Sequence, residues 1–122
     1  MSYKDLKIYQ RGYEAARACY RMTEDYPESE KYGITSQIRR AALSIPLNIA
    51  EGYAKQESAM EYNRFLMMAR GSVNEMQVLI DISYDLKYIG KEQHDKAYDE
   101  YEELAKMLNV FTHEVKNRKP KT

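Results

Sequence analysis

Few side chains in this sequence of 122 residues have the types and spacing that catalysis requires. A di-iron site in a helical bundle needs Glu-x-x-His on two helices, and neither His94 nor His113 follows a glutamate by three residues. Glu100 and Glu103 have the spacing of half a magnesium site, but no Glu-x-x-Asp follows them. Cys19 is the single cysteine, which excludes intramolecular disulfides and multi-cysteine metal sites. We therefore predict no catalytic residue, no metal site and no cofactor.

Basic side chains offer a second kind of chemistry, which is contact with the phosphates of a nucleic acid. The 19 Lys and Arg residues balance 19 Asp and Glu, so the formal net charge is zero and a uniformly basic RNA coat is excluded. The local basic clusters are Arg39 with Arg40 and, near the C-terminus, Lys116, Arg118, Lys119 and Lys121. These six are our candidate nucleic-acid-binding residues. The alternative for residues 116–122 is a flexible, solvated basic tail.

A narrow polar stripe crosses the segment ITSQIRRAALSIPLNIAEGYA when its residues are placed about 100° apart. Its members are Gln37, Arg40, Ser44, Asn48 and Glu51. Isoleucines flank the stripe on one side and two leucines, Leu43 and Leu47, flank it on the other. Because buried polar groups must be paired, we predict a structural hydrogen-bonded network along the stripe; contact of Arg39, Arg40 or Asn48 with a ligand or nucleic acid is the alternative. The two apolar flanks predict enclosure by the chain's own bundle and by another subunit.

Helices must position these residues, because apolar residues recur at intervals of three and four and show no sustained alternation. We predict helices over residues 5–25, 36–54, 58–90 and 92–116. Thr35 is the expected N-cap of the second helix, and Ser58 with Glu61 the expected capping box of the third. Pro46 is expected to kink the second helix. Short connections favour an all-α fold, an antiparallel up-down-up-down four-helix bundle that forms a single domain over residues 1–122.

The expected core is rich in tyrosine and methionine, since the chain has 12 Tyr and 7 Met but only two Phe and no Trp. The inward face of the first helix is predicted to carry Leu6, Tyr9, Tyr13, Ala16, Tyr20 and Thr23. Gly12 inside that helix predicts the close approach of a neighbour. No segment has the apolar length of a membrane span or a signal peptide, so we expect no membrane contact and a cytoplasmic location.

Tyr32 to Pro46, with the sequence YGITSQIRRAALSIP, and the NIAEG of residues 48–52 carry a family resemblance. Together they resemble the signature YGLTxQIRRAAxSIPxNIAEG of the four-helix-bundle proteins encoded in 23S rRNA intervening sequences. The similarity extends to DLK at residues 5–7, to Pro27-Glu28-x-Glu30, and to a third-helix motif over residues 65–75. It covers about residues 4 to 115.

This resemblance implies a bundle that assembles into a ring, typically a homopentamer, without catalytic activity. The implied partners are other copies of the chain and structured RNA. The related accessory variability determinants of diversity-generating retroelements share the bundle and the ring and work beside a reverse transcriptase. This chain departs from that group in its neutral net charge, which favours the intervening-sequence branch. The alternative function is a structural or protein–protein interaction module without nucleic-acid contact.

Overall fold

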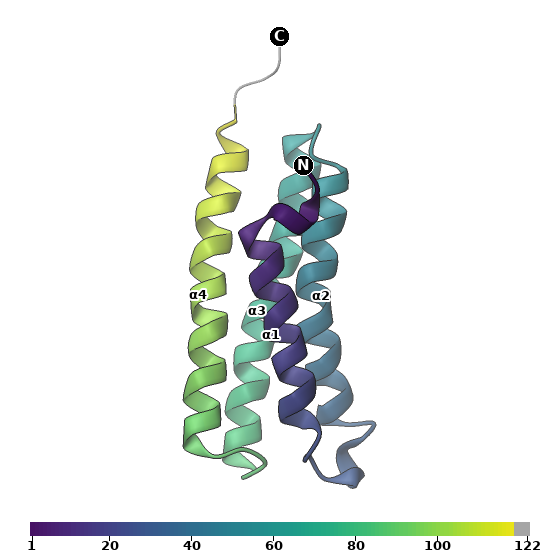
Figure 1. Cartoon of the computed structure of the whole chain (residues 1–122), viewed down its shortest axis with the longest axis vertical. Helices are drawn as coiled ribbons and strands as arrows, with labels where there is room; N and C mark the ends of the chain where they lie inside the picture. The colour runs from purple at the N-terminus through teal and green to yellow at the C-terminus, as the bar shows by residue number, and fades with distance from the viewer. Residues whose placement is uncertain (119–122) are drawn as a thin grey trace.

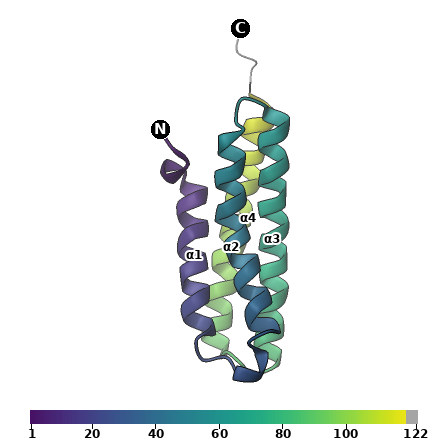
Figure 2. The ribbon, with the colours of Figure 1, turned by 90° about the vertical axis from the view of Figure 1, so that its right-hand side faces the viewer.

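The computed structural model describes residues 1–118 and shows four long helices packed side by side, each antiparallel to the one before it (Figure 1 and Figure 2). The helices are α1 Lys7–Thr23, α2 Ile34–Ala54, α3 Ala59–Asp85 and α4 Lys91–Lys116. Two short 3-10 helices, η1 Tyr3–Asp5 and η2 Glu28–Glu30, precede α1 and α2. The described residues contain no strand. The prediction of an all-α four-helix bundle is confirmed.

The connection before α2 differs from the prediction. The helix begins at Ile34, and Gly33 occupies the N-cap position in place of the expected Thr35. The Glu30 carboxylate accepts a hydrogen bond from the Ile34 N–H at 3.3 Å and another from the Tyr88 hydroxyl at 2.7 Å. A carboxylate at this position also interacts favourably with the positive end of the helix dipole. The capping group of α2 therefore comes from η2, four residues upstream.

The helix α3 is shorter than the predicted third helix, and its two ends show why. The Ser58 side chain accepts a hydrogen bond from the Glu61 N–H at 3.2 Å, as an N-cap does, while the Glu61 carboxylate turns to Arg64 Nε at 2.8 Å. At the other end α3 stops at Asp85, before the expected Gly90. Lys87 adopts φ 66°, in the left-handed region, and so breaks the helical path three residues earlier than the glycine.

The core lies along the shared axis of the bundle. Its fully buried large side chains include Ile38, Ile45, Ile49, Leu66, Met76, Ile80, Leu104 and Leu108. Small residues make up much of the buried face of α1: Gly12, Ala15, Ala16 and Cys19. The inward face predicted for α1 is confirmed at Leu6, Ala16 and Thr23, which are buried. It is wrong at Tyr13 and Tyr20, which are exposed. Small side chains allow α1 to lie close against α2, and the tyrosines stay at the rim, where their hydroxyls reach water.

Two further properties of the helices bear on function. α2 continues through Pro46 as one α-helix, so the sequence motif around this proline is presented on a single element. Among residues 1–118, no helix combines the length and the apolar character needed to cross a membrane.

Candidate functional site

The polar stripe of α2 forms its hydrogen bonds at its centre. The Ser44 hydroxyl donates to the Ala41 carbonyl at 2.9 Å and also pairs with the Ser72 hydroxyl of α3. Asn48 Nδ2 donates to the Ser44 carbonyl at 2.8 Å. The Ser44–Ser72 pair joins the middle of α2 to the middle of α3, and the other two bonds lie within α2. The other members of the stripe, Gln37, Arg40 and Glu51, are exposed.

Arg39 lies at the contact between α1 and α2. Its Nε donates to Thr23 Oγ1 at 2.8 Å and its Nη2 to the Tyr20 carbonyl at 3.4 Å. The guanidinium carbon also lies 4.6 Å from the centre of the Tyr20 ring, a cation–π distance. A cation at the last turn of α1 is favourable because that end of a helix carries partial negative charge. Arg39 thus binds α2 to the end of α1, whereas the neighbouring Arg40 faces solvent.

The basic candidates of the C-terminus lie at the other end of the bundle from these arginines. Lys116 ends α4 at the same end of the bundle as the α2–α3 connection (Figure 1). Arg118 Nη2 donates to the Gln56 carbonyl in that connection. From Arg40 to the last residue of α2, fourteen residues onward, the helix axis rises about 21 Å. The described candidates therefore form two separate groups. Lys119 and Lys121 lie outside the described residues.

Two lysines that the sequence reading missed join the C-terminal group. Tyr53 donates to the Met1 carbonyl at 3.2 Å, which ties the start of the chain to the end of α2. This contact brings the segment that carries the exposed Lys4 toward the exposed Lys55 that caps α2. The members of this group, which we call the basic end, are Lys4, Lys55, Lys116 and Arg118. Lys4, Lys55 and the pair Lys116 and Arg118 are far apart in the sequence, so only the topology brings them to one end.

His94 is a further polar site that sequence reasoning did not find. It lies in the first turn of α4 and is partly buried. Its Nε2 lies 2.7 Å from Asp81 Oδ1 on α3, and its Nδ1 lies 2.9 Å from Asp95 Oδ1. The ring stacks on Tyr98 at 5.6 Å. Residues 1–118 contain no group of three or more His, Cys, Asp or Glu side chains arranged to hold a metal ion.

We predict that the pKa of His94 lies above its ordinary value of 6.5, because Asp81 and Asp95 accept hydrogen bonds from the imidazolium. A raised pKa in the folded state means that this interaction stabilises the bundle fully below about pH 6.5. The contribution is lost as the pH rises through the raised pKa of the folded state. An NMR titration of the His94 ring measures this value. Asp81→Asn should move the titration to lower pH, and an unchanged titration would exclude Asp81 as the partner.

The outward face of α3 carries exposed apolar side chains among charged ones such as Arg64 and Glu75. The exposed fractions are 80% for Met60, 60% for Met67, 57% for Val78 and 40% for Ile82. These four residues, which we call the outer α3 strip, fall within about 60° of one another on the helix. On α2, the exposed Leu43 and Leu47 form a second apolar surface.

The two flanks of the polar stripe on α2 thus have different environments. The isoleucine flank, with Ile38, Ile45 and Ile49, is fully buried inside the bundle, so enclosure by the chain itself is confirmed for this side. The leucine flank, Leu43 and Leu47, faces solvent in the single chain. Enclosure of this second flank by another subunit stays a prediction.

Comparison with known proteins places the chain in a family. The family model described as 23S rRNA-intervening sequence protein matches residues 4–110. No curated protein matches the sequence. A similar solved structure is that of a protein of unknown function from the S23 ribosomal protein family of Bacteroides thetaiotaomicron, with a TM-score of 0.76. The two are 22% identical over 86% of this chain and 97% of that chain, a level at which the similarity shows the fold alone. Because the family model spans most of its length, the chain belongs to the 23S rRNA-intervening sequence protein family.

Proposed function

We propose that this chain is a non-catalytic bundle that assembles with copies of itself into a ring and binds structured RNA weakly through its basic end. The observation that carries the proposal is the pair of exposed apolar surfaces, the outer α3 strip and the Leu43–Leu47 surface of α2. Large exposed apolar patches are uncommon on monomeric proteins and mark contact surfaces. The family and the similar structure indicate no catalytic class.

The arrangement of the two surfaces supports a ring over a simple dimer. They belong to different helices and have different side chains, methionine and β-branched residues on α3 and leucines on α2. Contact between two unlike surfaces is heterologous, and repeated from copy to copy it forms a closed ring or an open filament. The closed ring is the form that the family resemblance implies. Five copies is the number that the family resemblance implies.

Val78→Asp is expected to dissociate the assembly into monomers of 14.4 kDa. Burying an unpaired carboxylate at the contact should raise the dissociation constant on the order of a hundredfold or more. Multi-angle light scattering at micromolar concentration measures the mass. Val110→Asp is the matched control, because Val110 is 60% exposed but lies on α4. A monomeric wild-type chain, or an intact assembly with Val78→Asp, would overturn the ring.

The basic end supports the second part of the proposal. In a ring, the four cations of the basic end recur in every copy, so several weak phosphate contacts act together. Each copy contributes little alone, since the acidic Glu57 lies in the same connection and Glu114 in the last turns of α4. Weak, salt-sensitive binding is therefore what the charge distribution favours.

We predict that Lys116→Glu with Arg118→Glu weakens binding to a 23S rRNA stem-loop at low salt by about tenfold or more, because phosphate contacts are lost. A filter-binding titration measures the affinity. Arg21→Glu with Lys31→Glu is the control, since it makes the same change of charge at exposed positions of the opposite end. Equal weakening by both double variants would show that the loss of affinity comes from the change in net charge and not from the basic end. Assembly without RNA binding by the wild-type chain would favour the protein-interaction module instead.

A further inference from the structure

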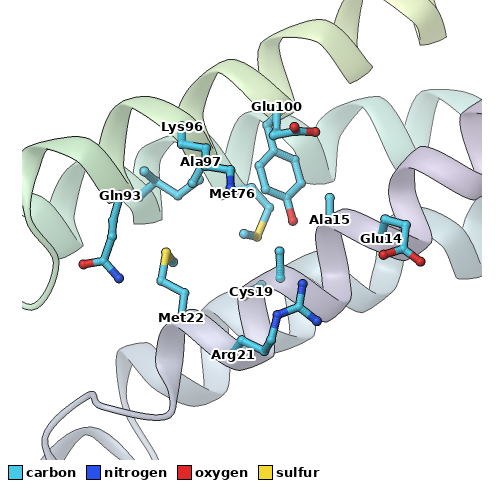
Figure 3. Close-up of a pocket in the computed structure, with 13 residues that line it drawn as sticks. Glu14, Ala15, Cys19, Arg21, Met22, Met76, Gln93, Lys96, Ala97 and Glu100 are labelled. Carbon is cyan, nitrogen blue, oxygen red and sulfur yellow. The ribbon is translucent and has the colours of Figure 1, made fainter.

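A groove with a volume of about 470 Å³ lies between α1 and α4 (Figure 3). Figure 3 shows Ala15, Cys19 and Met22 of α1 opposite Gln93 and Ala97 of α4, and Met76 of α3 also lines the groove. The groove exists because alanines stand on both facing helices and leave the space between the backbones unfilled. Its volume lies within the range of sites that bind small molecules.

A buried hydroxyl without a partner lines this groove. Tyr101 of α4 is 3% exposed, and its hydroxyl has no hydrogen-bond partner among residues 1–118. Burial raises the pKa of Tyr101, and the nearby Cys19 raises it further, so the hydroxyl keeps its proton and can donate. A buried donor that lacks an acceptor costs free energy, which a ligand with an acceptor would recover.

The other lining groups restrict the chemistry of that ligand. Three sulfur atoms, from Cys19, Met22 and Met76, line the groove, and sulfur packs favourably against aromatic rings. Charged residues at the groove occur in equal numbers of both signs: Glu14, Glu100, Arg21 and Lys96. Equal numbers of positive and negative groups favour a ligand without net charge. We propose that the groove binds a neutral aromatic small molecule whose acceptor oxygen takes a hydrogen bond from Tyr101.

Two probes of similar shape test this site, acetophenone with a carbonyl acceptor and ethylbenzene without one. In a protein labelled with ¹³C at the methionine methyl groups, both probes should shift the signals of Met22 and Met76 in a saturable way. Met60 and Met67 on the outer α3 strip are controls within the same spectrum. Acetophenone should bind about three- to tenfold more tightly than ethylbenzene, the range expected for one hydrogen bond. Absence of saturable shifts at Met22 and Met76 would overturn the proposal.

Tyr101→Phe isolates the hydrogen bond. The variant should keep the fold, because the hydroxyl has no partner within the described chain to lose. Its affinity for acetophenone should fall to that for ethylbenzene, and its affinity for ethylbenzene should not change. Ala97→Leu, which fills the groove from α4, should abolish binding of both probes. A preference for acetophenone that survives Tyr101→Phe, or binding that survives Ala97→Leu, would overturn the proposal.

Discussion

Replacement of Ile45 by alanine is expected to lower the free energy of unfolding by about 3 kcal/mol. Ile45 is fully buried, and its Cγ2 lies directly over Gly12 of α1, 3.1 Å from the position that a Cβ would take there. The substitution removes three buried carbon atoms and leaves a cavity at the closest approach of α1 and α2. Urea denaturation followed by circular dichroism measures the change.

Two companion variants make this prediction specific. Val110→Ala, at an exposed position of α4, should cost less than about 0.5 kcal/mol. Gly12→Ala should destabilise the wild-type chain through its contact with Ile45, but in the Ile45→Ala background it should become neutral or stabilising, since alanine favours the helix over glycine by about 1 kcal/mol. Equal costs for Ile45→Ala and Val110→Ala, or additive effects of Gly12→Ala and Ile45→Ala, would contradict this account of the α1–α2 contact.

The second large effect is expected from Gly52→Val, which should cost about 2 to 3 kcal/mol by overpacking the contact of α2 with α3. A Cβ at this position would lie 3.0 Å from the Cβ of Phe65 and 3.3 Å from the backbone oxygen of Tyr62. Both atoms are fixed to the backbone of α3, so the helix itself would have to move. Thermal and urea unfolding at equal protein concentration measure the loss.

Gly71→Val is the matched control for Gly52→Val. Gly71 is also a helical glycine, but nothing lies within 4 Å of the Cβ that a side chain would add there. Valine favours the helix slightly over glycine, so this variant should be neutral or slightly stabilised. If both valine variants lose the same stability, the close contact at Gly52 is not its cause.

The helical class of this protein is readable from its sequence because the period of apolar residues is local information. The spacing from Tyr62 through Leu66, Ala69 and Val73 predicts the buried face of α3, and these residues are buried. The pattern fails on α1 at two tyrosines for a physical reason. Tyr13 and Tyr20 count as apolar in a helical pattern, yet the closest packing is made by residues with little or no side chain.

Contacts between residues far apart in the sequence could not be predicted from a local pattern. His94 and Asp81 meet because α3 and α4 are antiparallel neighbours, and neither residue has a local signal that identifies the other. The polar stripe shows the same limit. Its pattern on α2 is visible in the sequence, but the Ser72 hydroxyl that pairs with Ser44 comes from another helix. The division of the arginine and lysine candidates between two ends follows from the topology of the bundle.

The shared position of the first residue and the end of α4 has a practical consequence for studying this protein. Met1 contacts Tyr53 at the end of α2, and Arg118 contacts Gln56 just beyond it, so both lie at the basic end (Figure 1). An affinity tag or fluorescent protein fused before Met1 or directly after Arg118 would lie against the surface proposed to bind RNA. The connection between α3 and α4, residues 86–90, lies at the opposite end. A short epitope inserted there would allow the protein to be detected with an antibody while the basic end stays free.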